Sequence, residues 1–343
     1  NEIKFDKAYI NKYSVRVGTA AARLRDDVPL EEKKRRWKIL NDIVNQPRVE
    51  KPKLIVVLGP TASGKSALAV KLAKEFDCEV ISADSRQVYR GMDIGTGKIT
   101  KKEMQGILHY LLDLVSPKKQ FTAAQYKEKA IEAINKIYKK GKIPVICGGT
   151  GFYIQAVVDG LIIPTVKPDW KLRKGLEKKS AEELFRELKK IDPRRANNID
   201  PHNCRRLIRA IEIIKKTRKP VPVFQQQQKF DALYIGIKKP FKELKELIKK
   251  RLLRRIKQGM INEVKKLKNS GVSWKRLDDF GLEYRYISRY LQKKITKKQM
   301  INQLQKEIEH YVKRQMTWFK RDKRIKWVEN YGGAIEFVNK FLS

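Results

Sequence analysis

Short apolar runs alternate along the chain with longer segments in which apolar residues recur every three or four positions. The short runs are rich in Ile, Val and Leu, which predicts buried β-strands. In the longer segments, residues such as Tyr126, Ala130 and Ile134 lie about one turn apart, which predicts helices with one apolar face. The predicted strands are 53–59, 78–84, 142–149, 232–237 and 324–329. The predicted helices include 66–76, after the first strand, and 123–138, before the third.

Strands that alternate with helices predict a parallel sheet covered by helices on both faces. The carboxyl ends of parallel strands lie at one edge of the sheet, and ligands bind beyond that edge. In this chain the first three predicted strands lead into residues 59–66, 82–85 and 148–150. These three segments are therefore expected to converge on one site.

The pattern changes outside this core. Residues 162–222 contain charged helical stretches without a strong strand and predict a small helical insertion, whereas 240–320 predicts basic helices. The predicted fold is therefore α/β, with a P-loop NTPase-like parallel sheet core, a helical insertion and a basic helical C-terminal part. The predicted domains are an N-terminal extension with a linker at 1–50, the core with its basic helices at 51–161 and 223–343, and the insertion at 162–222.

Composition adds a strong charge asymmetry. The 343 residues include 79 Lys and Arg against 38 Asp and Glu, which gives a net charge of +41. Such an excess favours binding to a polyanion, and the basic clusters at 238–268 and 289–326 suit RNA, the second because aromatic residues are interleaved in it. A lysine-rich composition or a solvated surface is the alternative explanation.

The cysteines and the apolar runs indicate which classes of protein the sequence does not fit. Cys78, Cys147 and Cys204 are far apart and provide neither a disulfide framework nor a metal-binding pair. This usage predicts a reducing, cytoplasmic location. No apolar run approaches the ~20 residues that a membrane-spanning helix requires, so no membrane association is expected.

The clearest chemical signal is G-x-x-x-x-G-K-S between the first predicted strand and the first predicted helix. Backbone N–H groups of this loop, at a helix N-terminus, form a concave site for phosphate. Lys65 reaches a phosphate oxygen, and the hydroxyl of Ser66 suits Mg²⁺ as the cofactor. The predicted phosphate-binding residues are Gly59, Pro60, Thr61, Ala62, Ser63, Gly64, Lys65 and Ser66.

Two further residues follow predicted strands. Asp84 is placed to bind Mg²⁺ through water or to accept a proton from a nucleophile, with a turn or helix N-cap as the alternative role. Thr150 is either a hydroxyl donor to a ligand or an ordinary N-cap. The loop alone leaves the reaction open, because a kinase that uses ATP and an RNA-binding NTPase without transferase activity would both need it.

Several blocks, in order and spacing, resemble the tRNA dimethylallyltransferases, also called tRNA isopentenyltransferases. The resemblance covers about 52–335 and is carried by "GPTASGKSALAVKLA", "ISADSRQVYRGMDIGTGK", "GGTGFYIQAVVDGL", "RRLIRAIEI" and "YVKRQMTWFKRD". It implies transfer of a dimethylallyl group from dimethylallyl diphosphate to N6 of the adenosine just 3′ of the anticodon of tRNA, with release of pyrophosphate. A monomer bound to one tRNA anticodon loop is the expected partner arrangement.

The resemblance also implies roles for individual residues. Asp84 would contact N6 and accept its proton, while Thr150 and Arg255 would hold the diphosphate, with Arg251 as the alternative to Arg255. Residues 280–287, "FGLEYRYI", depart in length from a common version of that block. The implied tRNA contacts are Asp84, Ser85, Arg86, Gln87, Arg205, Arg206 and Arg209.

The first 46 residues resemble a different family, the tRNA methylthiotransferases. The matching stretch, "YINKYSVRVGTAAARLRDDVPLEEKKRR", is similar to the end of their radical-SAM region, which acts on the same adenosine after prenylation. The C-x-x-x-C-x-x-C motif of those enzymes is absent from this sequence. A remnant of a fused pathway protein is the hypothesis, and an extension without a function of its own is the alternative.

Overall fold

The computed structural model describes residues 18, 27–44, 51–164, 166–222 and 229–343. The chain divides into two compact units, Asn1–Lys51 and Pro52–Ser343. In the first unit the described element is the helix α1 (Leu30–Val44), which carries exposed ion pairs such as those of Glu32 with Arg35 and Arg36. Most of the segment that resembles the methylthiotransferases, and most of the predicted linker, lie outside the described residues.

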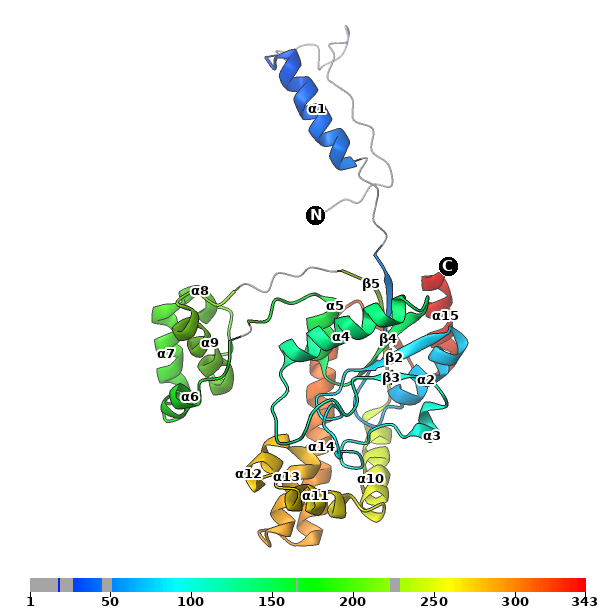
Figure 1. Ribbon diagram of the computed structural model, residues 1–343, viewed down its shortest axis with the longest axis vertical. Coiled ribbons are helices and arrows are strands. Elements are labelled where there is room, and N and C mark those ends of the chain that lie inside the picture. Colours follow the sequence, from blue (N-terminus) through cyan, green and yellow to red (C-terminus); the bar gives the residue numbers. More distant parts are fainter. Residues whose placement is uncertain (1–17, 19–26, 45–50, 165, 223–228) are drawn as a thin grey trace. The chain divides into compact units, whose positions relative to one another are not determined.

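The second unit is built on one parallel sheet, as predicted (Figure 1). The strand order is β3-β2-β4-β1-β5-β6, and every neighbouring pair is parallel. The sheet therefore places β1 between β4 and β5, with Val57 opposite both Cys147 and Ile235. The strands are β1 (Lys53–Leu58), β2 (Cys78–Ser82), β3 (His109–Tyr110), β4 (Ile143–Gly148), β5 (Asp231–Ile237) and β6 (Lys326–Val328).

Helices cover both faces of this sheet (Figure 1). Alternate residues of β1 point to opposite faces, so Val56 and Leu58 join one buried cluster while Ile55 and Val57 join the other. The helices α4 and α5 pack in the first cluster, and α2 and α15 pack in the second. The helices around the sheet are α2 (Lys65–Glu75), α3 (Lys101–Met104), α4 (Ala123–Tyr138), α5 (Gly151–Val158) and α15 (Tyr331–Leu342).

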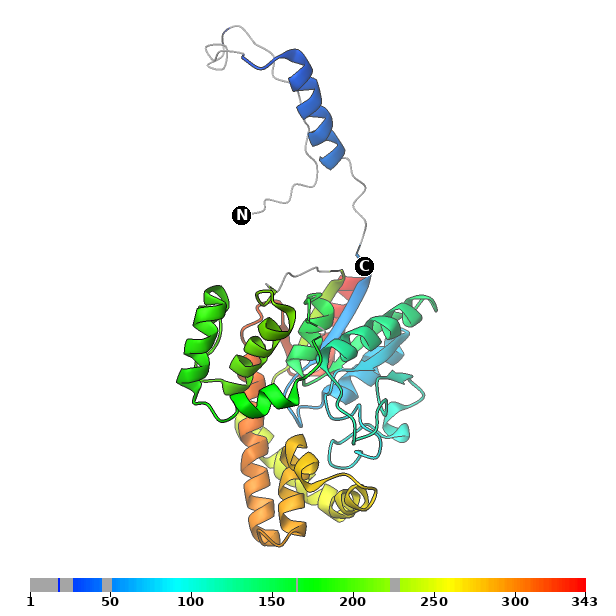
Figure 2. The same cartoon turned by 60° about the vertical axis from the view of Figure 1, so that its left-hand side comes forward.

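A separate apolar cluster holds the basic C-terminal helices together. It includes Leu252, Val264 and Tyr284, and residues Val88 and Met92 of the loop after β2 pack into it. Figure 2 shows the longest of these helices, α14 in orange, running from this cluster up to the sheet. The helices are α10 (Phe241–Lys257), α11 (Met260–Asn269), α12 (Trp274–Phe280), α13 (Leu282–Leu291) and α14 (Lys297–Phe319).

Several details differ from the prediction. The second strand ends at Ser82 rather than Asp84, so Asp84 lies in the turn beyond the sheet. The charged helical stretches predicted in the insertion include two helices before residue 192, and the second begins where the Ser180 side chain accepts a hydrogen bond from Glu183 N. The strand His109–Tyr110 was not predicted, because two residues are too few to show a hydropathy pattern. Among the described residues, no helix has the length and apolarity that a membrane crossing requires.

The insertion has its own core and its own buried charge. Leu184, Leu188, Leu207 and Ile211 form the centre of that core. Glu212 is fully buried and accepts hydrogen bonds from Asp169 N, from Arg173 and from Arg209. The insertion helices are α6 (Trp170–Leu176), α7 (Ala181–Ile191), α8 (Pro193–Ala196) and α9 (Cys204–Thr217).

Replacing Glu212 by Gln should destabilise the insertion and change its acid sensitivity. Burial raises the pKa of Glu212, but hydrogen bonds from Arg173, Asp169 N and Arg209 outweigh it and bring the pKa to about 2. A carboxylate with a lowered pKa stabilises the fold above its ordinary pKa, and this stability is lost as the pH falls from about 4.5 to about 2. Breaking a buried pair costs about 3–5 kcal/mol, so Glu212→Gln should speed amide exchange in α9 at neutral pH. Because Gln does not titrate, the stability of the variant should also fall less between pH 4.5 and pH 2 than that of the wild type.

The matched control is Glu187→Gln in the same insertion. Glu187 pairs with the partly exposed Lys179 and Lys215, and exposed pairs contribute about 0–1 kcal/mol. Hydrogen exchange of α9 peptides from the intact chain distinguishes the two variants. Equal exchange rates in both variants would contradict a structural role for Glu212.

Candidate active site

The phosphate-binding loop lies between β1 and α2, as predicted. Gly64 takes a left-handed conformation, with φ of 94°, which lets the chain turn directly into α2. The N-terminal amides of this 11-residue helix therefore border the loop. Lys65 Nζ donates a hydrogen bond to Pro60 O at 3.3 Å, so the ammonium group lies over the loop. The loop thus combines helix amides with one cation, the arrangement that a phosphate group needs.

Asp84 and Thr150 meet at the ends of β2 and β4, which are neighbouring strands. Ser85 N donates to Thr150 Oγ1 at 3.1 Å, and Thr150 N donates to Ala83 O at 3.1 Å. Thr150 makes no side-chain cap to α5, so the N-cap alternative for its hydroxyl is wrong. Its oxygen instead holds the turn that carries Asp84 against β4.

The carboxylate of Asp84 is oriented by its own turn. Asp84 Oδ1 accepts hydrogen bonds from Arg86 N at 2.8 Å and from Gln87 N at 3.3 Å. Within the described residues, Oδ2 has no hydrogen bond. The turn role predicted as an alternative for Asp84 is therefore real, and it leaves one carboxylate oxygen available for chemistry.

Gln315 joins the phosphate-binding loop to the Thr150 turn. Its Oε1 accepts a hydrogen bond from Thr61 N at 2.9 Å, and its Nε2 donates to Gly149 O at 2.9 Å. A Cβ atom on Gly149 would lie 2.4 Å from Gln315 Nε2, so only glycine fits there. One buried amide on α14 thus sets the distance between two predicted parts of the site.

Arg251 and Arg255, one turn apart on α10, both reach this site. A Cβ atom on Gly97 would lie 1.5 Å from Arg255 Nη2 and 2.2 Å from Arg251 Nη2, so both guanidinium groups pack against Gly97. Arg255 Nη1 donates to Gly95 O and to Glu283 Oε1, each at 3.3 Å. Arg251 makes no hydrogen bond or ion pair within the described residues. The two guanidinium groups therefore lie side by side against Gly97.

The cations of this site are desolvated and affect one another. Burial lowers the pKa of Lys65, Cys147 and Asp84 raise it, and Arg251 and Arg255 lower it further. Burial lowers the pKa of Arg251 to about 10, and the charge of Arg255 adds to that effect. The contacts agree with this, because Gln87 of the Asp84 turn donates to Gly97 O and both arginines pack against Gly97. An anion bound here would relieve the repulsion among the cations.

The predicted tRNA-contacting residues fall into two groups. In the first, Arg86 Nε donates to Phe280 O at 2.9 Å, and Gln87 Nε2 donates to Gly97 O at 3.4 Å. In the second, Arg205 and Arg206 are exposed at the start of α9, whereas Arg209 pairs with Glu212 and donates to Val166 O at 3.0 Å. Arg209 therefore has a structural task in the insertion, and the structure does not bring the α9 arginines into the site around Asp84.

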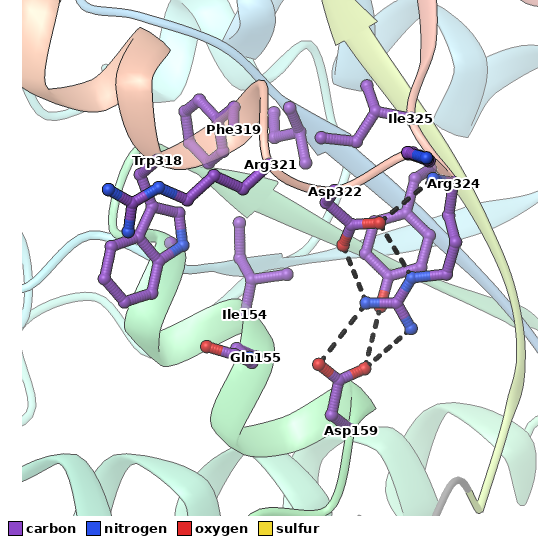
Figure 3. Close-up of a pocket in the computed structure, with 13 residues that line it drawn as sticks. Ile154, Gln155, Asp159, Trp318, Phe319, Arg321, Asp322, Arg324 and Ile325 are labelled. Carbon is purple, nitrogen blue, oxygen red and sulfur yellow. Dashed lines mark hydrogen bonds and ion pairs between the residues drawn. The ribbon is translucent and has the colours of Figure 1, made fainter. Parts of the chain in front are cut away.

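A cavity of about 640 Å³ opens beside the Thr150 turn (Figure 3). Trp318 and Arg321 lie at one end, and at the other end Arg324 pairs with Asp159 at 2.7 Å and with Asp322. Trp318 packs on Gly151, where a Cβ atom would lie 2.4 Å from the indole ring. The cavity thus combines an aromatic ring with exposed basic side chains directly behind Thr150.

Ser66 is the residue predicted to bind Mg²⁺. It is exposed in the first turn of α2, next to Lys65. Among the described residues no cluster of three or more His, Cys, Asp and Glu side chains could hold a metal ion. A magnesium ion at this loop would therefore take most of its ligands from phosphate oxygens and water, as Mg²⁺ commonly does.

Three residues of this site were not predicted from the sequence. Gln315 interrupts the apolar stripe of Leu304, Ile308, Val312 and Phe319 on α14, and a polar residue at such a buried position was the available signal. Glu263 and Glu283 gave no local signal. Their contacts are with loops and helices distant in the sequence.

Replacing Gln315 by Leu should destabilise the fold around the phosphate-binding loop. Leu has nearly the same size but leaves Thr61 N and Gly149 O without partners, and each buried unsatisfied group costs about 1–3 kcal/mol. Urea unfolding followed by circular dichroism would measure the change. The matched control is Gln305→Leu, since Gln305 Nε2 bonds only to Glu309 in the same helix. Equal free energies of unfolding for the two variants would contradict the bridging role.

Known proteins are similar to this chain in sequence. A model of the family described as IPP transferase matches residues 87–322. The tRNA dimethylallyltransferase of Acetivibrio thermocellus is 39% identical over 284 residues, which are 80% of this chain and 91% of that protein. The tRNA dimethylallyltransferase of Lachnoclostridium phytofermentans is 40% identical, also over 284 residues, with 80% and 91% covered.

Solved structures resemble the fold as well. The full-length tRNA isopentenylpyrophosphate transferase of Bacillus halodurans aligns with a TM-score of 0.64 and 35% identity, covering 85% of this chain and 96% of that chain. A eukaryotic dimethylallyltransferase acting on tRNA aligns with a TM-score of 0.72 and 25% identity, covering 85% and 79%. The chain thus belongs to the IPP transferase family, as the resemblance of its motifs predicted.

Proposed function

We propose that this protein transfers a dimethylallyl group from dimethylallyl diphosphate to N6 of the adenosine 3′-adjacent to the anticodon of tRNA. The observation that carries the proposal is the position of Asp84, whose turn is held by Thr150 and by Gly97, the glycine against which Arg251 and Arg255 pack. A base beside an anion-binding loop suits a reaction in which a nucleophile loses a proton while a diphosphate leaves. The similar proteins described above are tRNA dimethylallyltransferases, which supports the same reaction.

In the proposed reaction, the adenine amine attacks the allylic carbon while the C–O bond to the diphosphate breaks. Pyrophosphate leaves with the electron pair of that bond, and the amine proton passes to Asp84. The loop amides, Lys65 and Arg255 stabilise the negative charge that develops on pyrophosphate. Thr150 holds the turn of Asp84 and offers its hydroxyl to a diphosphate oxygen. The residues from Gly59 to Ser66 enclose the diphosphate.

Magnesium fits this proposal as a cofactor at Ser66. When bound, Mg²⁺ would neutralise charge on the pyrophosphate leaving group. The Ser66 hydroxyl in the first turn of α2 is the protein ligand that we assign to it, and diphosphate oxygens and water would complete the octahedron. The cationic side chains remain responsible for orienting the diphosphate.

The RNA substrate is supported by charge and by the cavity behind Thr150. The net charge of +41 favours a polyanionic partner. Trp318 offers a surface on which an unpaired base stacks, and Arg321 offers a charge for its phosphate. An adenine inside a stacked anticodon loop is out of reach, so we propose that it is flipped into the site. Arg86, Gln87, Arg205 and Arg206 remain the proposed tRNA contacts, together with Asp84, Ser85 and Arg209.

The transfer itself is the direct test of the function. The protein is incubated with radiolabelled dimethylallyl diphosphate, Mg²⁺ and unmodified tRNA, and we expect label in the tRNA. A tRNA with guanosine in place of the target adenosine is the matched control and should stay unlabelled. Absence of transfer, together with ATP hydrolysis or phosphorylation, would assign the chain to the NTPase or kinase class instead.

Replacing Asp84 by Asn should lower the rate of transfer without abolishing tRNA binding. The amide keeps an oxygen for Arg86 N and Gln87 N but accepts no proton, so kcat should fall by about 10²–10⁴-fold. Single-turnover transfer and a filter-binding assay measure the two effects separately. Asp77→Asn, an exposed carboxylate at the other end of β2, is the control and should leave both unchanged. Full activity of Asp84→Asn would mean that Asp84 only shapes the turn.

A further inference from the structure

A buried carboxylate shares the arginine that we assign to the diphosphate. Glu283 Oε1 lies 3.3 Å from Arg255 Nη1, and the two side chains are 12% and 9% exposed. Burial raises the pKa of Glu283, and the charge of Arg255 opposes that rise without cancelling it. In its ionised form Glu283 pairs with the cation that a diphosphate would need.

The fold holds Glu283 firmly in this place. Gly281 and Leu282 both take positive φ, of 76° and 40°, so that α13 begins sharply and Glu283 lies in its first turn. The next residue, Tyr284, donates its hydroxyl proton to Glu263 Oε1 at 2.9 Å. The position of the Glu283 carboxylate is therefore set by the start of α13.

Glu263 in turn fixes the loop on the other side of Arg255. Its carboxylate accepts hydrogen bonds from Asp93 N at 2.9 Å, Ile94 N at 2.6 Å and Gly95 N at 3.0 Å. Three amides on one carboxylate hold the loop rigidly, and Gly95 O of that loop accepts a hydrogen bond from Arg255 Nη1. Arg255 is thus clamped between this loop and α13.

The clamp engages only one nitrogen of Arg255. Both hydrogen bonds of this guanidinium within the described residues come from Nη1, while Nη2 packs against Gly97 beside Arg251. The remaining N–H groups of Arg255, and all of those of Arg251, are available to an anion. Glu283 therefore orients Arg255 and at the same time weakens its attraction for that anion.

Stability alone explains this pair poorly. Desolvation of two charges often outweighs their attraction, so a well-packed apolar residue would stabilise the fold as well as or better than Glu283. Near an anion-binding site, however, a fixed negative charge has a specific effect. It disfavours every anionic ligand, including a product that must leave.

We propose that Glu283 is a positioning residue that orients Arg255 and limits the affinity of the site for pyrophosphate, so that the product is released after transfer. This inference rests on the proposed function, because it assumes that Arg255 binds the diphosphate. Glu283 acts only through its negative charge, and no covalent bond to it is formed or broken. The site therefore binds pyrophosphate more weakly and releases it faster after each transfer.

The test is the affinity of the Glu283→Gln variant for inorganic pyrophosphate in the presence of Mg²⁺, measured by calorimetry. Gln keeps the size and a hydrogen-bond acceptor for Arg255 but removes the charge. We expect the Kd for pyrophosphate to fall about tenfold, which corresponds to about 1.4 kcal/mol. The steady-state kcat should fall and the KM for dimethylallyl diphosphate should fall with it, while single-turnover transfer is not accelerated. If Glu283 only held Arg255 in place, its replacement by Gln would weaken pyrophosphate binding and raise the Kd.

Two further variants make the outcome decisive. Glu79→Gln removes another buried carboxylate, which pairs with Lys140 at 3.0 Å on β2, and should leave pyrophosphate affinity unchanged. Glu283→Asp withdraws the carboxylate by one methylene and should give an affinity between those of the wild type and Glu283→Gln. It replaces the Gln variant if that variant does not fold.

The outcomes separate the inference from the function on which it rests. If the wild type transfers the prenyl group and binds pyrophosphate, but neither Glu283 variant binds it more tightly, the inference is wrong and the proposed function stands. If the wild type neither binds pyrophosphate nor modifies tRNA, the proposed function falls and the inference falls with it. Tighter binding in the Glu283 variants, but not in Glu79→Gln, supports the inference.

Discussion

Lys65, Arg251 and Arg255 bring three positive charges close together, with Arg255 buried and the other two half-buried, and each of them lowers the pKa of a neighbour. Like charges in a medium of low polarity repel strongly. The fold offsets this repulsion with Asp84 and Glu283 and leaves a cationic excess that only an anionic ligand removes. The sheet edge, the phosphate-binding loop and the start of α13 are all required for this balance, because each contributes one of the charges.

The parts of the fold that depend on local pattern could be predicted from the sequence. The apolar run at 53–58 and the glycines around Lys65 specify a strand, a loop and a helix by themselves, since each depends on neighbours within about ten residues. The convergence of Asp84 and Thr150 followed from parallel topology, because β2 and β4 are adjacent. The resemblance implied Arg255 with Arg251 as the alternative, and the guanidinium groups of both lie against Gly97.

What could not be predicted depends on contacts between distant segments. Glu283 meets Arg255 across 28 positions and Gln315 meets Thr61 across 254, and no local pattern records either meeting. Arg209 shows the converse problem. The resemblance implied an RNA contact for Arg209, and the structure adds hydrogen bonds to Glu212 and Val166 O, a role within the insertion that no local pattern records. A single sequence does not separate an arginine that meets a ligand from one that meets a buried carboxylate.

The bridge made by Gln315 has a consequence for how the two substrates influence one another. The same helix carries Gln315 at the catalytic edge and the apolar face that packs among the basic helices. A displacement of α14 by bound RNA would alter the spacing between Thr61 and Gly149, which border the proposed diphosphate site. Thermodynamic linkage is reciprocal, so a diphosphate that favours one spacing must change the affinity for RNA by the same factor. The side-chain amide of Gln315 would thereby couple the binding of RNA to the binding of a diphosphate.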